Sequence, residues 1–152
     1  MNADASNARP KRAVRWMGTE YSTTLTRTDS AGLLGIFESW VPAGEGPPLH
    51  VHHNEDEVLH VLEGQYEFWI DGTTTRRGPG SSIFLPRGVP HGFRVLGDEV
   101  GRNLTILTPG GFEGFFAEAA ARDLAIPRNM AALAELGGLY GLEFLGPVPW
   151  KE

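Results

Sequence analysis

Residues 44–64 contain an unusual concentration of side chains that bind metal ions. His50 and His52 are two positions apart, so both imidazoles point to the same face if this segment is an extended strand. Glu57 follows five residues later and begins a mainly apolar run, residues 58–62. A strand, a short polar turn and a returning strand would therefore bring Glu57 beside the two histidines.

A fourth metal ligand is available at His91, at the end of a second stretch rich in glycine and proline, residues 80–91. Three imidazoles and one carboxylate suit divalent iron, manganese, cobalt, nickel or zinc, and they suit calcium poorly. They can fill four positions of an octahedral ion and leave two neighbouring positions for water, substrate or dioxygen. The sequence therefore predicts one divalent transition-metal ion bound by His50, His52, Glu57 and His91.

The first stretch resembles the first signature motif of the cupin superfamily. That motif is a glycine, five residues, His-x-His, three or four residues, a glutamate, six residues and a glycine. Its fixed positions fall without departure on Gly44, His50, His52, Glu57 and Gly64.

The second stretch resembles the second cupin motif, which is a glycine, five residues, Pro-x-Gly, two residues and a histidine. Its positions fall on Gly80, Pro86, Gly88 and His91, and Val95 replaces the asparagine that often ends the motif and is not a metal ligand in the family. The resemblance implies a jelly-roll β-barrel. It does not by itself select a reaction, because one fold supports many chemistries.

The spacing of turn residues independently predicts an all-β protein, because short strands that alternate with glycine- and proline-rich turns are typical of antiparallel barrels and sandwiches. The expected extended segments are residues 14–28, 33–41, 57–62, 65–70, 73–77, 82–85, 92–96 and 103–108. Alanine-rich sequence after residue 111 predicts short helices over 112–123 and 127–136, the second ended by Gly137 and Gly138.

These segments predict a single-domain jelly-roll with short C-terminal helices, divided into three parts. Residues 1–13 are expected to form a flexible N-terminal arm, residues 14–111 the cupin barrel, and residues 112–152 a helical segment and tail packed on the barrel. A length of 152 residues suits one domain with a substantial core.

Composition excludes several other classes of protein. The chain has 13 lysines and arginines against 19 acidic residues, for a net charge of −6, which argues against a nucleic-acid partner. It has no cysteine, so disulfides and thiolate metal sites are excluded. No signal peptide or membrane-spanning run is recognisable, and a cytoplasmic protein is expected.

Several polar residues near the predicted ligands compete for a role in the site. Glu55 and Asp56 are the main rivals of Glu57, but they lie in the predicted turn rather than at the start of the strand. Alternation places His53 and His60 on faces away from the predicted ligands. Arg87, with Arg76 and Arg77, is expected to be a solvated turn charge, although it could instead guard the barrel mouth and attract an anionic substrate.

The same alternation predicts a partner. If Glu57, Leu59 and Val61 line the interior, then Val58, His60 and Leu62 face outward, as does Trp69 from the next strand. An apolar outer face needs cover, from the terminal segments or from a second subunit, and a homodimer is predicted.

The predicted function is that of a metal-dependent dioxygenase acting on a small enolisable or aromatic substrate, because the sequence resembles quercetinase-type cupins. Glu57 is the candidate catalytic base, since its carboxylate could accept the substrate's proton. Two alternatives remain open. The metal could act only as a Lewis acid in an isomerase, cyclase or lyase, or the protein could bind a small ligand without turnover.

Overall fold

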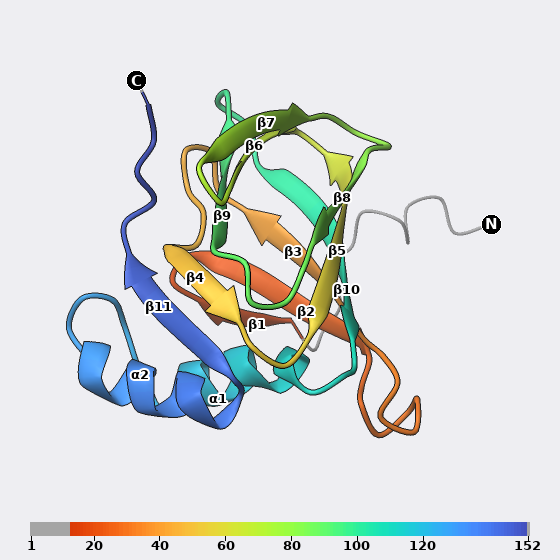
Figure 1. Ribbon diagram of the computed structural model, residues 1–152, viewed down its shortest axis with the longest axis vertical. Helices are drawn as coiled ribbons and strands as arrows, with labels where there is room; N and C mark the ends of the chain where they lie inside the picture. The colour runs from red at the N-terminus through yellow and green to blue at the C-terminus, as the bar shows by residue number, and fades with distance from the viewer. Residues whose placement is uncertain (1–12, 152) are drawn as a thin grey trace.

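The computed structural model describes residues 13–151, which form two antiparallel sheets facing each other and two short helices (Figure 1). The predicted N-terminal arm therefore lies almost wholly outside the described residues. The first sheet contains, in spatial order, β1 (Val14–Trp16), β2 (Thr19–Leu25), β3 (Gly35–Val41), β10 (Gly101–Thr108), β5 (Asp56–Glu63) and β8 (Ser82–Leu85). The second contains β11 (Leu142–Gly146), β4 (Leu49–His52), β9 (His91–Leu96), β6 (Gln65–Ile70) and β7 (Thr73–Arg77).

The core lies between the two sheets. Burial alternates residue by residue along β3, β5 and β10, so one face of each strand is interior and the other is turned outward. The chain passes back and forth between the sheets, since β3 and β5 lie in the first sheet and β4 in the second. This arrangement confirms the predicted all-β jelly-roll fold.

The motif glycines have backbone conformations that other residues adopt only with strain. Gly44, Gly64, Gly80 and Gly88 have φ angles of 79°, 88°, 88° and 77°, in the left-handed region that glycine enters without a Cβ penalty. Their positions in the sequence therefore set where the chain turns before and after the strands that carry His50 and His91.

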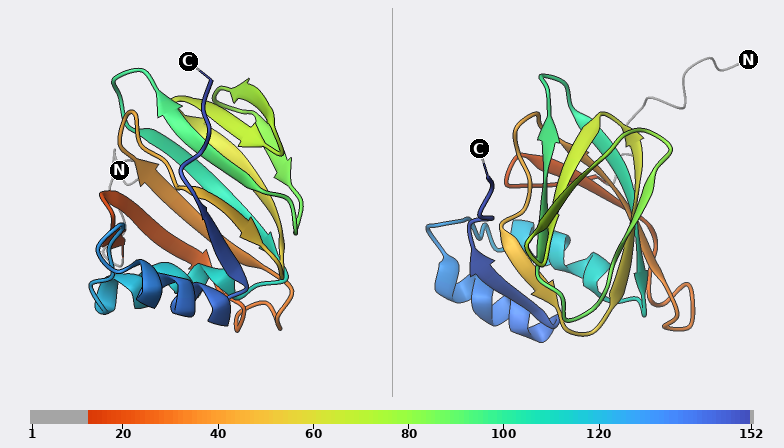
Figure 2. Two further views of the ribbon diagram at one scale, coloured as in Figure 1. Left: turned by 60° about the vertical axis from the view of Figure 1, so that its left-hand side comes forward. Right: turned by 45° about the horizontal axis from the view of Figure 1, so that its top comes forward.

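The two helices close one end of the space between the sheets, as both views of Figure 2 show. A short 3₁₀ turn, η1 (Phe112–Gly114), leads into α1 (Phe115–Ala121), and a loop then leads to α2 (Met130–Leu139). Phe112, Phe115 and Phe116 pack with Leu133 and other residues in one buried cluster beneath the sheets.

The second helix differs from the prediction at both ends. It begins at Met130 rather than near Pro127, and it continues through Gly137 and Gly138. A Cβ at Gly137 would lie only 2.8 Å from the carbonyl oxygen of Leu142, so this glycine allows the helix to pack closely on the next strand rather than ending it. Met130 at the start of the helix is 37% exposed, whereas Leu133 and Leu136 are fully buried.

The tail forms a strand that the sequence did not indicate. Residues 112–152 were expected to end in a tail packed on the barrel, and within that tail β11 pairs with β4 in the second sheet, with Phe144 opposite His50 and Leu142 opposite His52. The C-terminal segment thus fixes the edge of the strand that carries two predicted metal ligands. None of the described helices is long and apolar enough to span a membrane.

Candidate metal centre

Three histidine side chains converge between the two sheets. His50 and His52 come from β4, and His91 comes from the first position of β9, where it pairs with His50 across the ladder. One ring nitrogen of each histidine lies within 4.8 Å of the others, and all three residues are buried. This spacing allows the three imidazoles to bind one metal ion.

The backbone fixes two of these rings in the orientation that a metal ligand requires. The Nδ1 atom of His50 lies 2.7 Å from the carbonyl oxygen of Pro48, and that of His91 lies 3.2 Å from the carbonyl oxygen of Val89. A ring that donates its Nδ1–H to an oxygen carries an unprotonated Nε2, which is the atom available to an ion.

The third ring is oriented by a carboxylate. The Nδ1 atom of His52 lies 2.9 Å from Oε1 of Glu55, whose side chain is buried. A carboxylate that accepts the second N–H of a ligand histidine fixes its tautomer and makes it a better ligand. From the sequence, Glu55 is expected only as a rival of Glu57 for the metal. Its position three residues from His52 was the available indication of this supporting role.

Glu57 enters the same space from the opposite sheet. Its Oε2 lies 3.5 Å from Nε2 of His52 and 3.2 Å from Nε2 of His91. Among the described residues, this oxygen is the one buried side-chain nitrogen or oxygen atom without a hydrogen-bond partner. A buried carboxylate oxygen left unpaired is costly, and a cation beside it removes that cost. The residues present therefore fit a divalent metal ion.

The protonation states favoured by the site are those that a metal requires. Burial raises the pKa of Glu57, but the imidazoles, His52 first and then His91 and His50, outweigh burial and hold this pKa at about 2. Burial holds the pKa of His50 well below its ordinary value, and the other two imidazoles lower it further. The carboxylate is thus ionised and His50 neutral at pH 7, as ligands must be.

Asp56 and Arg87 hold the two motifs together. The backbone N–H of Arg87 donates to Oδ1 of Asp56 at 2.9 Å, and its guanidinium donates to Oδ2 at 3.2 Å and to the carbonyl oxygen of Thr108 at 3.4 Å. Arg87 does not line the cavity beside the histidines. As expected, Arg87 is a half-exposed turn charge, and its contacts also fasten the turn before His91 to β5.

The other histidines lie outside the cluster, as expected. His53 is half exposed, and its Nε2 lies 2.8 Å from Oε2 of Glu143. His60 is turned to the outer face of the first sheet, where its Nδ1 lies 2.7 Å from Oγ of Ser82.

The histidines and Glu57 open onto a cavity of about 420 Å³ between the sheets. Its walls are mainly aromatic and aliphatic, and many come from segments outside the two motifs. The ring of Phe112 contacts the ring of His52 edge-on, with centroids 4.4 Å apart. Neither motif contains these wall residues, and their spacing in the sequence does not mark them. The larger ones include Trp16, Tyr21, Phe37, Phe93, Phe112 and Phe144.

Replacing one buried imidazole should abolish stoichiometric metal binding. We expect His52→Ala to lose most of its metal, because it removes one of the three imidazole ligands. His60→Ala, which changes a histidine on the outer face, is the matched control and should retain the wild-type metal content. Elemental analysis of metal per chain is the measurement, and full stoichiometry in His52→Ala would refute its role as a ligand.

Metal affinity should fall as the pH decreases, because protons compete for the imidazoles. Burial lowers the pKa of His52, but Glu57 and Glu55 raise it by more, so the net pKa is above its ordinary value. His52 therefore begins to take up a proton above the ordinary histidine pKa as the pH falls, and the zinc dissociation constant should rise about tenfold per pH unit below the pKa of His52.

Glu55→Gln removes one of the charges that raise the pKa of His52, so the loss of affinity should begin at a lower pH than in the wild type. Glu143→Gln, which affects the exposed His53, should leave the onset unchanged. Chelator competition measured over a pH series tests this, and an unshifted onset in Glu55→Gln would contradict it.

Comparison with known proteins agrees with the motifs and the fold. Residues 37–107 match the Cupin domain family. Quercetin 2,3-dioxygenase of Bacillus subtilis is 33% identical over 81 residues, which are 53% of this chain and 24% of that protein. Dimethylsulfoniopropionate lyase DddQ of Ruegeria pomeroyi is 40% identical over 63 residues, which are 41% of this chain and 31% of the lyase.

Among solved structures, the polyketide cyclase RemF from Streptomyces resistomycificus is 30% identical, with a TM-score of 0.53 over 59% of this chain and 64% of the cyclase. The chain spans less than a third of the length of the first two relatives, so it is similar to one part of each. Both signature motifs, the two-sheet fold, the convergent histidines and the family match lead to one conclusion, that this chain contains a cupin domain over residues 37–107.

Proposed function

We propose that this cupin is a metal-dependent dioxygenase that acts on a small enolisable or aromatic substrate. One observation carries the proposal: the unpaired buried oxygen of Glu57 and the three imidazoles face an aromatic-walled cavity of about 420 Å³. A cavity of this size and character suits a small organic molecule. The similarity to a quercetin 2,3-dioxygenase supports oxygen chemistry in particular.

The proposed centre has His50, His52, His91 and Glu57 as its ligands. A divalent ion of iron, manganese, nickel, cobalt or zinc would supply a Lewis-acidic centre with coordination positions left for a substrate oxygen and for dioxygen. The protein residues place the substrate, since the aromatic walls hold a planar ring and exclude bulk water from it.

Glu57 is the proposed base for the substrate's hydroxyl proton. Its low pKa arises from positive charge on the surrounding imidazoles. A bound divalent ion would likewise keep this carboxylate ionised, and an ionised carboxylate can accept a proton. Its unpaired Oε2 is then the atom that accepts the proton.

Non-redox chemistry is the second candidate, and a specific observation favours it. The polyketide cyclase RemF is 30% identical to this chain, and the chain covers 64% of it, a larger share than of the dioxygenase. In that case the same metal centre would activate a carbonyl or enolate without consuming oxygen. A ligand-binding cupin without turnover remains the third possibility.

Oxygen uptake separates these functions. We expect metal-loaded protein to consume dioxygen when it is offered flavonols or other enolisable ring compounds, and protein stripped of metal to consume none. Elemental analysis of untagged protein, purified without chelators, identifies the metal to be loaded. A substrate that is converted without oxygen uptake would support the cyclase, isomerase or lyase function and overturn the dioxygenase proposal.

In the same assay, Glu57→Gln should reduce activity per bound metal at least tenfold, because an amide cannot accept the proton. A general base typically increases the rate roughly 10²- to 10⁴-fold. Normalising to bound metal separates loss of the base from loss of a ligand. Activity per metal equal to that of the wild type would rule out the base role.

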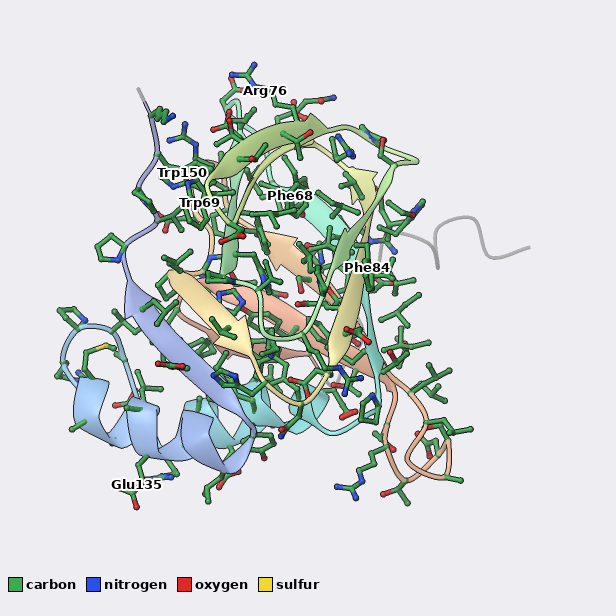
Figure 3. The ribbon with its side chains drawn as sticks, in the orientation of Figure 1. Phe68, Trp69, Arg76, Phe84, Glu135 and Trp150 are labelled. Carbon is green, nitrogen blue, oxygen red and sulfur yellow. The ribbon has the colours of Figure 1, made fainter. Side chains whose placement is uncertain are left out.

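We also propose that the protein is a homodimer. Phe84 on β8 is 57% exposed and lies opposite Val58 on the outer face of the first sheet, which Leu62 extends. Figure 3 shows Phe84 at the outer side of β8 and Phe68 within the barrel. Trp69, which was expected to add to this surface, lies on β6 in the second sheet and so belongs to a different face.

Sedimentation velocity at micromolar concentration should show a dimer in the wild type and a monomer in Phe84→Glu, since a buried charge without a partner destabilises an apolar interface. Leu139→Glu is the matched control, because Leu139 is 76% exposed on α2, at the helical end of the molecule. A wild-type monomer would refute the dimer.

A further inference from the structure

We infer that the cavity contains a second subsite, made by Ser39, Asn103 and Thr105, which binds a neutral acceptor oxygen of the ligand, such as a ring carbonyl. The inference deepens the proposed function and rests on its premise that an organic molecule binds in this cavity beside the metal centre. It adds a specific polar contact at a distance from the metal ligands.

The three residues lie together on the interior face of the first sheet. Ser39 on β3 is paired with Asn103 on β10, and Thr105 is the next interior residue along β10. They are 3%, 1% and 1% exposed, and all three line the cavity that the metal centre faces. Each is thus a polar group placed where the surrounding walls are mainly apolar.

The register places this subsite close to Glu57 but separate from it. Glu57 pairs with Leu107 across the β5–β10 ladder, and Thr105 is two residues from Leu107 on the same face. Two residues along a strand correspond to roughly 6.6 Å. A flat ligand with one edge at the metal centre can therefore reach Thr105 with a group on its opposite edge.

Asn103 is held in one orientation by its neighbours. The hydroxyl of Tyr66 donates to Oδ1 of Asn103 at 2.9 Å, and Nδ2 of Asn103 donates to Oγ1 of Thr105 at 3.2 Å. An amide nitrogen has two protons, so a second donor on Asn103 is still available. Thr105 accepts a hydrogen bond here, and its own hydroxyl proton has no acceptor among the described residues.

Ser39 adds a third group. Its hydroxyl has no hydrogen-bond partner among the described residues. In the described part of the chain, Oε2 of Glu57 is the one side-chain nitrogen or oxygen atom that is both fully buried and without a hydrogen-bond partner. The hydroxyl oxygen of Ser39 is therefore not fully enclosed by protein. The oxygen of Ser39 therefore meets the cavity rather than surrounding protein atoms.

A purely structural role explains only part of this group. The bond from Tyr66 accounts for the presence of Asn103, because buried polar groups must be paired. It does not account for the unused hydroxyl proton of Thr105. Nor does it account for the hydroxyl of Ser39, which alanine would replace at no cost in hydrogen bonds.

The donors available also define the ligand group. Asn103 and Thr105 each have a proton to donate, and Ser39 can donate as well. The complementary atom of the ligand is therefore an oxygen that accepts hydrogen bonds. All three are uncharged and almost fully buried, and a negative charge placed there would lose its hydration without gaining a counterion. A neutral carbonyl therefore fits this subsite better than a carboxylate.

Two probe compounds that differ at one edge test the inference. 2-Hydroxy-1,4-naphthoquinone has adjacent oxygens for a metal and a carbonyl on the far side of the same ring. 1,2-Dihydroxynaphthalene has the adjacent oxygens and the same two-ring body but no far carbonyl. Isothermal titration calorimetry of each compound, without air, uses the full chain loaded with zinc, which does not undergo redox chemistry.

We expect Thr105→Val and Ser39→Ala each to weaken binding of the naphthoquinone roughly 3- to 10-fold, the effect of one lost hydrogen bond. Binding of the dihydroxynaphthalene should be unchanged in both variants. Thr105→Ser retains the hydroxyl and should bind the naphthoquinone as the wild type does. Ser22→Ala is the matched control, because Ser22 is also buried, at 4% exposure, but does not line the cavity.

Equal losses for both compounds, or no loss for either, would overturn the subsite while leaving binding beside the metal, and so the proposed function, intact. A wild-type protein that binds zinc but neither compound would overturn both. Zinc content and thermal unfolding report whether each variant folds. Ser39→Ala removes a single oxygen atom and supplies the decisive comparison if Thr105→Val does not fold.

Discussion

The outward hydrogen bonds of the three histidine rings are the interactions on which the metal centre depends. His50 and His91 donate to backbone carbonyl oxygens within two residues of themselves, so the local course of the chain sets the direction of each ring. His52 depends instead on the Glu55 carboxylate. A ring bound at Nδ1 cannot rotate without losing that bond in a buried site, where an unpaired donor is costly. The inward Nε2 atoms are therefore fixed before any ion arrives, and little reorganisation is needed for binding.

The parts of the site that the sequence predicts are those whose geometry is local. Two residues of extended strand between His50 and His52 place both rings on one face, whatever the rest of the chain does. His91 requires only a turn of fixed length after Gly88. The hydrogen bond from the backbone N–H of Gly88 to the carbonyl oxygen of His52, at 2.8 Å, shows how directly that turn is attached to the ligand strand.

The remainder of the site depends on contacts between distant segments, which periodicity does not encode. Phe112 packs on His52 from a 3₁₀ turn that follows the last barrel strand. The pairing of β11 with β4 joins the tail to the ligand strand, and the sequence of the tail does not specify which strand it pairs with. For the same reason, Gly137 does not end α2 as predicted. The close approach of the Leu142 backbone, rather than local helix propensity, explains why glycine stands at this position.

This division explains why the reaction is harder to assign than the metal centre. The ligands come from two motifs, whereas the groups that would select a substrate come from β3, β10 and the segments after residue 108. Relatives that share the motifs can thus differ in every wall of the cavity, and similarity confined to the cupin domain constrains the metal ligands more than the substrate. The donors of Asn103 and Thr105 lie on β10 in the first sheet, across the cavity from the three histidines of the second sheet. In the proposed subsite they define the length and the polarity of the ligand that fits. In a cavity with a polar group at either end and aromatic rings between them, a planar molecule with oxygen atoms on two edges is the ligand that leaves fewest buried polar groups unpaired.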